Sequence, residues 1–587
     1  MEPTEMIKLT IDNKTIEVKK GTTILEAARQ NGIDIPTLCF LKQINEVGDC
    51  RMCIVEVEGR KGFATSCIQT VEEGMIVKTH SPEVLEARKI ILDLILSNHH
   101  KDCLTCSRSG NCELQALAIK FNVQKVEYEG QMSQHQIDDK SPAIVRDFNK
   151  CILCRRCVAT CKNVQQIGAI DCIGRGFDSC ISTTYDHSLN DVDCTFCGQC
   201  IESCPTGALK EKEYIDEVWE KLKDEETYVV VQTAPAVRVA LGEEFGLPIG
   251  TNVKGKMVSA LKQMGFDKVF DTNTGADFTI MEEANEFIQR VQEGGKLPMI
   301  TSCSPGWVRF AEKNYPDLLE HLSTCKSPNQ MFGALLKSYF AEKQGISPEK
   351  ICTVSIMPCI AKKYEISREE MQVDGIRDVD YVLTTRELAR MIRQANINFN
   401  QLEDSLFDDP MGEATGAGAI FGTTGGVMEA ALRTAADTLE GKNLEKLTYE
   451  PVRGESGIKE ASFLLAGKEV KVVVASGLAN ARKIMEEIKS GKADYQFVEI
   501  MACPGGCVMG GGQPIKSSKI RASIDVRKAR ADALYAIDEA SVIRKSHENP
   551  TIQKIYQEFL GKPGSHMAHK YLHTSYSKRK NMKFKEV

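Results

Sequence analysis

The first 32 residues show a regular alternation of apolar and polar positions. "IKLTIDNKTIEV" (7–18) alternates along two short runs, which predicts a strand, a turn and a second strand. "GTTILEAARQNG" (21–32) follows with a threonine that can cap a helix and a glycine that can end it. This region therefore predicts a small sheet with one helix.

The hydrophobic pattern changes from about residue 215. Apolar runs now alternate with helical segments such as "NEFIQRVQEGG" (285–295) and "RELARMIRQAN" (386–396). The apolar runs are "TYVVVQTAPAV" (227–237), "KICTVSIMPC" (350–359) and "VKVVVASG" (470–477). This half predicts an α/β domain with buried strands. "GEATGAGAIFGTTGG" (412–426) does not match the dinucleotide fingerprint, so we interpret it as close packing near a site.

Composition narrows the class of protein. The chain has 587 residues, 42% hydrophobic and 26% charged, which is typical of a soluble protein with several domains. A net charge of −7 argues against binding to nucleic acid or anionic lipid. There is no signal-peptide pattern and no apolar run long enough to span a bilayer, so we expect a cytoplasmic protein that does not bind membranes.

The chain contains 23 cysteines, and the absence of a secretion signal favours metal or redox roles over disulfides. The first group has the spacing C-x10-C-x2-C-x13-C, at Cys39, Cys50, Cys53 and Cys67. Four thiolates on loops around a small sheet suit a [2Fe–2S] cluster, although structural zinc also uses four thiolates. The layout resembles the plant-type, β-grasp ferredoxin module, which favours the cluster.

The second group, "NHHKDCLTCSRSGNC" (98–112), has only three cysteines, Cys103, Cys106 and Cys112. His99 or its neighbour His100 directly precedes them and can supply a fourth ligand. The pattern resembles the histidine-ligated [4Fe–4S] module of respiratory complex I and iron-only hydrogenases, which selects His99. Imidazole in place of a thiolate makes the site less negative, so we expect a raised reduction potential.

The third group repeats the spacing C-x2-C-x2-C-x3-C, in "CILCRRCVATC" and "CTFCGQCIESCP". This repeat is the bacterial signature for two [4Fe–4S] clusters, in which the fourth cysteine of each run ligates the other cluster. One predicted ligand set is Cys151, Cys154, Cys157 and Cys204. The other is Cys194, Cys197, Cys200 and Cys161. Cys172 and Cys180, between the runs, follow no pattern.

Three segments of the second half carry a cysteine near the end of an apolar run. They are "TSCSPGW" (301–307), "IMPCIAKKYE" (356–365) and "EIMACPGGCVMGGGQP" (499–514). In this order they resemble the three signature motifs of [FeFe]-hydrogenases. The C-terminal stretch "RKSHENPTIQKIYQEFLGKPGSHMAHKYLHT" (544–574) resembles the small subunit of that family, fused into one chain.

The resemblance implies an H-cluster, a [4Fe–4S] cube joined through a cysteine sulfur to a two-iron unit with CO, cyanide and a dithiolate bridge. The residues that map onto cube ligands are Cys359, Cys503 and Cys507, of which Cys507 is the bridging thiolate. The residues that map onto the surroundings of the two-iron unit are Lys362, Pro235, Met357, Phe421 and Met501. For the two methionines an ordinary core position is nearly as good an interpretation.

The segment "TSCSPGW" departs from the family motif, which has two adjacent cysteines. Position by position, Cys303 falls on the residue that passes protons to the bridging amine, and Ser304 falls on the fourth cube ligand. Two alternatives stay open: Ser304 ligates iron as an alkoxide, or Cys303 supplies the thiolate while Ser304 lies near the amine. A serine hydroxyl is a poorer acid and a harder ligand than a thiol.

The resemblance also carries over a proton route through Glu283, Glu286 and Ser323. The two glutamates are three residues apart, so on a helix they share a face and can hand protons outward. Without the resemblance, a solvated surface charge would be about as good an interpretation of each glutamate as a place in a proton route.

These features predict five regions, with the fold class multidomain α+β and α/β. They are a β-grasp [2Fe–2S] domain (1–82), a His/Cys3 [4Fe–4S] module (83–125), a two-[4Fe–4S] ferredoxin domain (142–213), an α/β H-cluster domain (215–525) and a helical small-subunit-like tail (526–587). The predicted function is reversible interconversion of H2 with protons and electrons. Alternatives are an electron-wiring subunit of a respiratory or formate-oxidising complex, or a hydrogen sensor.

The amino-acid sequences around the second and third cysteine groups are most similar to those in the catalytic subunit of NAD-linked, electron-bifurcating hydrogenases. The resemblance implies ferredoxin as a partner, flavin- and NAD-binding partner subunits, and separate maturation proteins that install the two-iron unit. A single-chain, ferredoxin-dependent enzyme is the simpler alternative.

Overall fold

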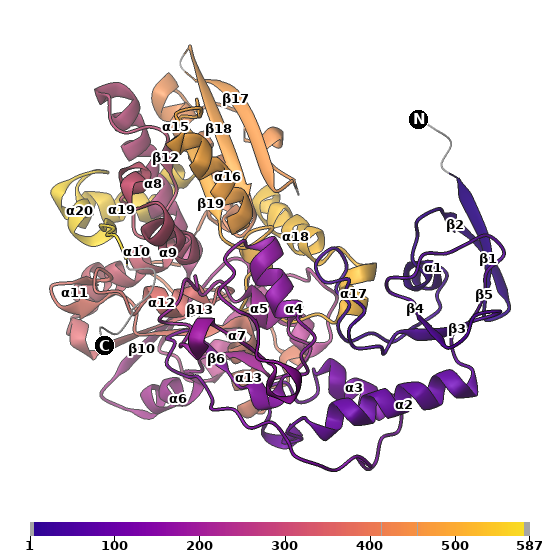
Figure 1. The fold of residues 1–587 in the computed structure, drawn as a ribbon. Helices are drawn as coiled ribbons and strands as arrows, with labels where there is room; N and C mark the ends of the chain where they lie inside the picture. Colours follow the sequence, from indigo (N-terminus) through magenta and orange to yellow (C-terminus); the bar gives the residue numbers. More distant parts are fainter. Residues whose placement is uncertain (1–4, 413, 446, 455, 466, 580–587) are drawn as a thin grey trace.

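The computed structural model describes residues 5–412, 414–445, 447–454, 456–465 and 467–579 (Figure 1). The first residues of the predicted N-terminal domain, the last residues of the predicted tail and four single residues of the predicted catalytic domain lie outside this described part. The described helices and strands form the mixed α and β arrangement expected from the sequence. Within it, no helix combines the length and the apolar character needed to cross a membrane.

The N-terminal domain is a five-stranded sheet with one helix, which lies at one side of the molecule (Figure 1). The strand order is β2 (Lys14–Lys19), β1 (Met6–Ile11), β5 (Ile76–Lys78), β3 (Ile54–Val57) and β4 (Phe63–Thr65). Helix α1 (Ile24–Gln30) begins after Thr23, whose hydroxyl accepts a hydrogen bond from the Glu26 amide at 3.2 Å. The predicted strand, turn, strand and helix are therefore confirmed.

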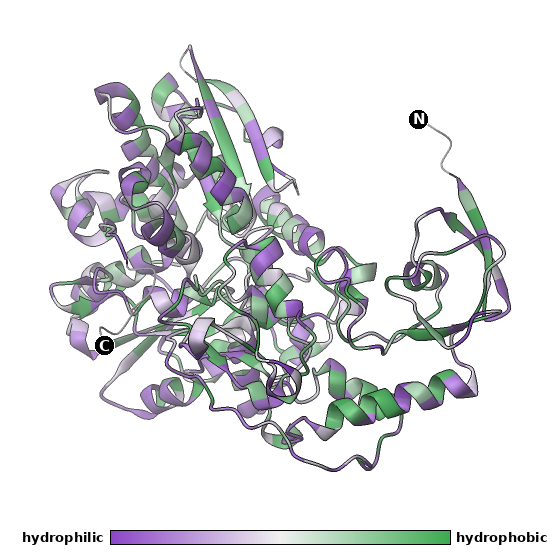
Figure 2. Cartoon of the chain, viewed as in Figure 1, coloured by the Kyte–Doolittle hydropathy of each residue, from purple (hydrophilic) through white to green (hydrophobic). Residues whose placement is uncertain are grey.

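Two short α-helices carry the second cysteine group, and a compact ferredoxin-like unit carries the third. Helices α2 (Pro82–Ser97) and α3 (Glu113–Lys120) flank the loop with Cys103 and Cys106. Apolar residues run along the C-terminal half of α2 (Figure 2). In the ferredoxin-like unit, β6 (Ile144–Arg146) pairs antiparallel with β9 (Leu209–Glu211), and β7 (Asp171–Ile173) pairs with β8 (Cys180–Ser182). Helices α4 (Arg156–Ala159) and α5 (Gln199–Ser203) lie within the two cysteine runs and carry Cys157 and Cys200.

The second half of the chain contains two four-stranded sheets. The first is parallel, in the order β11 (Lys268–Asp271), β10 (Tyr228–Thr233), β13 (Ile351–Met357) and β16 (Tyr381–Thr384). The second has parallel strands β12 (Met299–Ile300), β19 (Phe497–Met501) and β18 (Lys468–Ser476), and an antiparallel edge strand β17 (Ile458–Leu465). Every described residue of β13 and β19 is buried, as the continuous apolar runs predicted.

Helices pack around the two sheets of the second half of the chain. The longest is α8 (Thr272–Glu293), which contacts α10 (Pro328–Leu335) and α15 (Gly426–Glu440). Helix α9 (Pro305–Asn314) begins directly after Ser304, and α13 (Thr385–Gln394) follows β16 with a complete capping box. The glycine-rich segment around α14 (Gly416–Ile420) packs tightly, since a side chain on Gly418 would meet the Asn273 backbone oxygen at 2.6 Å.

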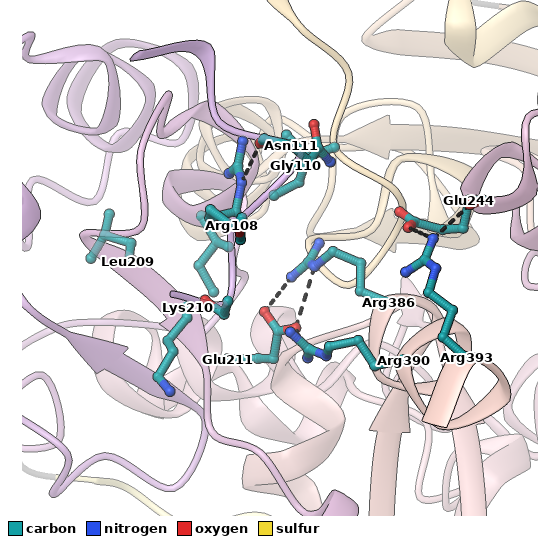
Figure 3. A pocket seen from close by; sticks show the side chains of 14 residues that line it. Arg108, Gly110, Asn111, Leu209, Lys210, Glu211, Glu244, Arg386, Arg390 and Arg393 are labelled. Atoms are coloured by element: carbon teal, nitrogen blue, oxygen red, sulfur yellow. Dashed lines mark hydrogen bonds and ion pairs between the residues drawn. The ribbon is translucent and has the colours of Figure 1, made fainter. Parts of the chain in front are cut away.

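Buried ion pairs join the ferredoxin-like unit to the second half of the chain. Glu211, at the end of β9, accepts hydrogen bonds from Arg386 at 2.6 Å and from Arg390 at 2.8 Å, both on α13 (Figure 3). Arg386 also donates to the Gly511 and Gln513 carbonyl groups of the third motif. Burial acts to raise the pKa of Glu211, but the charges of the two arginines hold it below its usual range.

This contact predicts that Glu211→Gln lowers the thermal unfolding midpoint at pH 7 by several degrees. Removing one member of a buried ion pair leaves the other charge uncompensated, at a cost of about 3–5 kcal/mol. Because the folded pKa is depressed, this contribution is present above the ordinary carboxyl pKa and disappears as pH falls below it.

Scanning calorimetry of the cluster-loaded chain measures the midpoint. Glu213→Gln is the matched control, because Glu213 pairs with Arg390 at a partly exposed position, where a pair contributes at most about 1 kcal/mol. Equal midpoints for the two variants would show that the buried pair does not hold the two units together.

Candidate active site

The cysteines of the three motifs lie where strands of the two sheets end. Cys303 follows β12, Cys359 follows β13, and Cys503 and Cys507 follow β19. Between these strand ends is a cavity with mostly apolar walls. Its lining includes all of the residues predicted to surround the two-iron unit, together with three of the cysteines: Lys362, Pro235, Met357, Phe421, Met501, Cys303, Cys359 and Cys507.

The structure separates the two adjacent residues Cys303 and Ser304. Cys303 lines the apolar cavity with Cys507. The Ser304 hydroxyl instead accepts a hydrogen bond from the Ala502 amide at 3.3 Å, next to Cys503. The Cys503 sulfur lies 4.0 Å from the Cys197 carbonyl oxygen of the ferredoxin-like unit. Cys303 therefore faces the cavity, and Ser304 lies on the side of Cys503.

Lys362 is the cation of the cavity, and a carboxylate holds it in place. Its ammonium group donates to both oxygens of Glu365 at 3.0 Å and to the Cys303 carbonyl at 3.2 Å. Glu365 in turn accepts from Gln330 at 3.1 Å. Glu365 was not among the residues predicted from the sequence, although its place three residues after Lys362 in a short helix is the spacing of an ion pair.

The burial of the cysteines fits a metal cluster. Burial, followed by the neighbouring Cys359, raises the pKa of Cys507 to about 12, and burial also raises the pKa values of Cys359 and Cys503. Buried thiols of this kind are thiolates only when a metal supplies the compensating charge. Soft sulfur donors beside an apolar cavity with one cation are suitable for an iron–sulfur cube and an adjoining cyanide-bearing unit.

The predicted proton-route residues lie close together on one side of the cavity. Glu283, in α8, is fully buried, and within the described residues its carboxyl oxygens accept no hydrogen bond of ordinary geometry, although Ser323 and the Ser302 backbone lie near enough to oppose the rise in its pKa. Burial, followed by the charge of Glu286, raises its pKa to about 8. Ser323 donates to Glu286 at 3.1 Å, and Arg290 pairs with Glu286 at 2.5 Å. Burial and then the charge of Glu283 raise the pKa of Cys303 well above its usual value.

The first cysteine group converges at the edge of the N-terminal sheet. The sulfur atoms of Cys53 and Cys67 lie 3.3 Å apart. The Cys39 amide donates to the Cys50 sulfur at 3.3 Å, and the Cys50 amide lies 3.5 Å from the Cys39 sulfur. The four predicted [2Fe–2S] ligands are therefore neighbours, and reciprocal amide contacts to sulfur are typical of a cluster-binding loop.

In the second group the structure distinguishes the two histidines. His99 is buried beside Cys103 and Cys112, and its Nδ1 atom has no partner among the described residues. Burial, with a smaller effect of the Lys101 charge, lowers the pKa of His99 to about 4, so its ring is neutral and able to bind a metal. The ring of His100 instead contacts the Gln134 side chain at 3.5 Å. An unpartnered, neutral, buried imidazole fits the fourth ligand.

The charges that act on the thiols of the third group fit the crossed arrangement predicted from its spacing. Burial and then Cys154, Cys204 and Cys151 raise the pKa of Cys157, which indicates that these four thiols are neighbours. Burial and then Cys197, Cys194 and Cys161 raise the pKa of Cys200 in the same way.

Single polar contacts connect the groups in space. The Asn45 amide donates to the Cys39 carbonyl at 2.8 Å and to the Cys154 carbonyl at 3.0 Å, so it bridges the first group and the ferredoxin-like unit. Arg108, from the second group, donates to the Cys204 carbonyl at 3.0 Å. Both outer groups therefore adjoin the same set of four cysteines, while the other set adjoins Cys503 through Cys197.

The raised pKa of Glu283 predicts a pH-dependent stability effect. Its native carboxyl binds a proton up to about pH 8, whereas the unfolded carboxyl loses it near 4.5, so the native state loses stability as pH rises through this window. Glu283→Gln removes this loss. We expect the unfolding midpoint of the variant to exceed that of the wild type by more at pH 9 than at pH 6, in thermal scans of the cluster-loaded chain.

Glu286→Gln is the matched control, because Glu286 accepts several hydrogen bonds and its replacement should lower the midpoint at both pH values. A difference between Glu283→Gln and the wild type that does not change with pH would contradict the predicted titration.

Comparisons with known proteins agree with this organisation. Residues 227–511 match the iron only hydrogenase large subunit, C-terminal domain, and residues 524–579 match the iron hydrogenase small subunit. Residues 4–82 match a 2Fe-2S iron-sulfur cluster binding domain. Residues 88–127 match the NADH-ubiquinone oxidoreductase-G iron-sulfur binding region, and 141–210 match the ferredoxin-like domain of NADH-quinone oxidoreductase subunit 3.

Whole-chain relatives are similar over nearly their full length. The NADP-reducing hydrogenase subunit HndD of Solidesulfovibrio fructosivorans is 49% identical, over 98% of this chain and 100% of that one. Iron hydrogenase 1 of Clostridium pasteurianum is 44% identical, over the same shares. A solved structure of [FeFe]-hydrogenase HydA1 from Chlamydomonas reinhardtii, 41% identical, covers 62% of this chain and 98% of its own with a TM-score of 0.56. The chain therefore belongs to the iron-only, or [FeFe], hydrogenase family, and it is an iron hydrogenase with [2Fe–2S], [4Fe–4S] and H-cluster domains.

Proposed function

We propose that this chain is the catalytic subunit of a multimeric, NAD-linked, electron-bifurcating hydrogenase in the cytoplasm. The proposal depends on a branch point in the predicted electron path. The first and second cysteine groups both adjoin one set of ferredoxin-type cysteines. An enzyme that exchanges electrons with a single carrier needs one entry point. Similarity to an NADP-reducing hydrogenase subunit and to NADH-quinone oxidoreductase regions supports an NAD(P)-linked partner.

Each of the two cysteine groups at the branch point can be assigned an electron-transfer partner. We assign a flavin-containing, NAD-binding subunit to the side of the [2Fe–2S] domain, and ferredoxin as a further electron carrier. Maturation proteins would install the two-iron unit. The likeness to respiratory subunits covers residues 88–127 and 141–210, and the hydrogenase likeness covers the remaining catalytic half, which favours a hydrogenase over a respiratory wiring subunit.

The chain's own residues would hold the H-cluster as follows. Cys359, Cys503, Cys507 and Ser304 would hold the cube, and Cys507 would also hold the two-iron unit. Lys362, fixed by Glu365, would donate to a cyanide, while Pro235, Met357, Phe421 and Met501 keep water from the two-iron unit. When bound, the H-cluster supplies the iron at which H2 is formed or cleaved.

The proton relay comprises Cys303, Glu283, Ser323 and Glu286. The Cys303 thiol faces the cavity and holds a proton at neutral pH, because burial raises its pKa. Glu283 holds the next proton, since its pKa of about 8 lies close to working pH. Ser323, hydrogen-bonded to Glu286, can pass a proton between the buried glutamate and the outer one. Arg290 keeps the Glu286 carboxylate in position.

The ligand assignment predicts opposite results for two neighbouring substitutions. Ser304→Ala should remove the paramagnetic signal of the reduced cube, because it removes one ligand. Cys303→Ala should keep that signal but nearly abolish turnover, because it removes the thiol of the proton relay. Electron paramagnetic resonance and H2 evolution on the same samples measure both effects.

Ser304→Cys is the matched control, since it supplies a thiolate, which iron prefers to an alkoxide, and should retain the cube. Retention of the cube in Ser304→Ala together with its loss in Cys303→Ala would reverse the assignment and make Cys303 the ligand.

The proposed partner predicts how the isolated chain behaves. Purified alone and matured, it should transfer electrons between H2 and a viologen dye, because the clusters are present. It should not evolve H2 from NADH, because its sequence contains no nicotinamide or flavin fingerprint. H2 evolution from NADH by the isolated chain would contradict the need for a partner subunit.

A further inference from the structure

The C-terminal segment passes directly along the outer part of the proton relay. Helix α20 (His566–Leu572) ends there, and the Lys326 amide donates to the Leu572 carbonyl at 2.8 Å. The Thr574 amide donates to the Thr324 carbonyl at 2.7 Å, and Tyr576 donates to the Ser323 carbonyl at 2.8 Å. This pairing puts His573 opposite Cys325, beside the Glu286 carboxylate.

A continuous line of hydrogen bonds connects Glu286 to a second buried glutamate through His573. The Thr324 hydroxyl lies 3.2 Å from Glu286 Oε2 and 2.7 Å from His573 Nδ1. On the other side of the ring, His573 Nε2 lies 3.0 Å from Glu282 Oε2. Glu282 is fully buried, and its carboxyl group also accepts from the Gly564 amide and the Tyr556 hydroxyl.

The Thr324 hydroxyl has one hydrogen and two neighbours that can accept it, Glu286 Oε2 and His573 Nδ1. Both oxygens of Glu286 also accept hydrogen bonds from other donors. When His573 Nδ1 bears a hydrogen, the Thr324 oxygen accepts it and the hydroxyl donates to Glu286. The geometry therefore places His573 where its Nδ1 atom decides the direction of the Thr324 hydroxyl.

Charged and titratable groups surround this imidazole on several elements. Glu282 and Glu286 of α8 and Arg290 lie around it, and the neighbouring His569 ring is 4.1 Å away between ring centres. Cys325 and Tyr556 complete the set of titratable groups that face it. The side chain of His573 is only 7% exposed, so its pairing with Glu282 is only weakly screened by solvent.

We infer that His573, supplied by the small-subunit-like tail, is a positioning residue of the proton relay that sets the direction of the Thr324 hydroxyl. With a proton on Nδ1, Thr324 donates to Glu286. Without that proton, Thr324 must turn to donate to Nδ1, and Glu286 loses one hydrogen-bond donor. The tail thereby couples the state of an imidazole nitrogen to the number of hydrogen bonds that the outer relay carboxylate accepts. This inference depends on the relay assigned under the proposed function.

The test compares substitutions of His573 and Thr324 in the matured full-length chain. His573→Ala should lower dye-linked H2 evolution roughly tenfold, the effect of losing one hydrogen bond to a charged group. Its iron content and its apparent KM for the dye should not change. Thr324→Val should have the same effect, and the double variant should be no slower than either single variant, because both remove one connection.

Two further variants separate positioning from damage to the fold. His573→Asn keeps an N–H near the Nδ1 position that cannot titrate, so it should recover most of the rate and shift the pH profile. His566→Asn, on an exposed position of the same helix, should behave like the wild type. The carboxylate infrared band of Glu286, assigned by its loss in Glu286→Gln, provides a second readout and should shift in His573→Ala, because the carboxylate loses a hydrogen-bond donor.

Three results would overturn the inference: a rate for His573→Ala equal to that of His566→Asn, losses that add up in the double variant, or an unchanged Glu286 band. If the wild-type chain itself exchanged no electrons between H2 and the dye, the proposed function would fail first, and this outcome is distinguishable from the other three.

Discussion

The burial of thiols at the ends of two converging sheets is the constraint on which the rest of the structure depends. Cys359, Cys503 and Cys507 are all located where water cannot stabilise a thiolate, and their pKa values are raised accordingly. The thiols of such a site become thiolates only when a metal is bound. The site also excludes bulk water as a source of protons. Electrons and protons therefore need separate routes: the N-terminal domains lie on the electron side, and the polar residues of α8 and the Ser323 loop lie near Cys303.

The electron route depends on close backbone approach at the seam with the ferredoxin-like unit. A side chain on Gly511 would lie 2.7 Å from the Cys197 carbonyl and the Gly198 backbone, so only glycine allows this contact. The same seam contains the buried pairs between Glu211 and the arginines of α13, which hold the two units in one relative position (Figure 3). Electron transfer requires that fixed proximity, whereas the proposed proton route requires an ordered line of polar groups.

Much of this organisation could be predicted from the sequence, because cluster ligands occur at short, regular spacings. The crossed sets that include Cys161 and Cys204 follow directly from the repeated run, and the alternating pattern of residues 7–18 predicted the first two strands. The choice of His99 over His100 needed the family resemblance, and the structure adds its buried, unpartnered ring nitrogen.

Contacts between distant segments could not be predicted. Asn45 and Cys154 are 109 residues apart, and Thr324 and His573 are 249 residues apart, so no local pattern reports their contact. The directions of Cys303 and Ser304 also depend on tertiary structure, because the start of α9 turns adjacent residues toward different sides. Spacing predicts which residues bind a cluster. The position of groups that hold a cavity residue in place, such as Glu365 beside Lys362, depends on packing.

The central claim is that these buried cysteines and the apolar cavity hold an H-cluster. Infrared spectroscopy of the chain, purified after expression with the maturation proteins, tests it most directly, since proteins have almost no other absorption where iron-bound CO and cyanide absorb. The account predicts sharp CO and cyanide bands that change when H2 replaces the inert gas. A sample with its accessory iron–sulfur clusters intact but without those bands would contradict it.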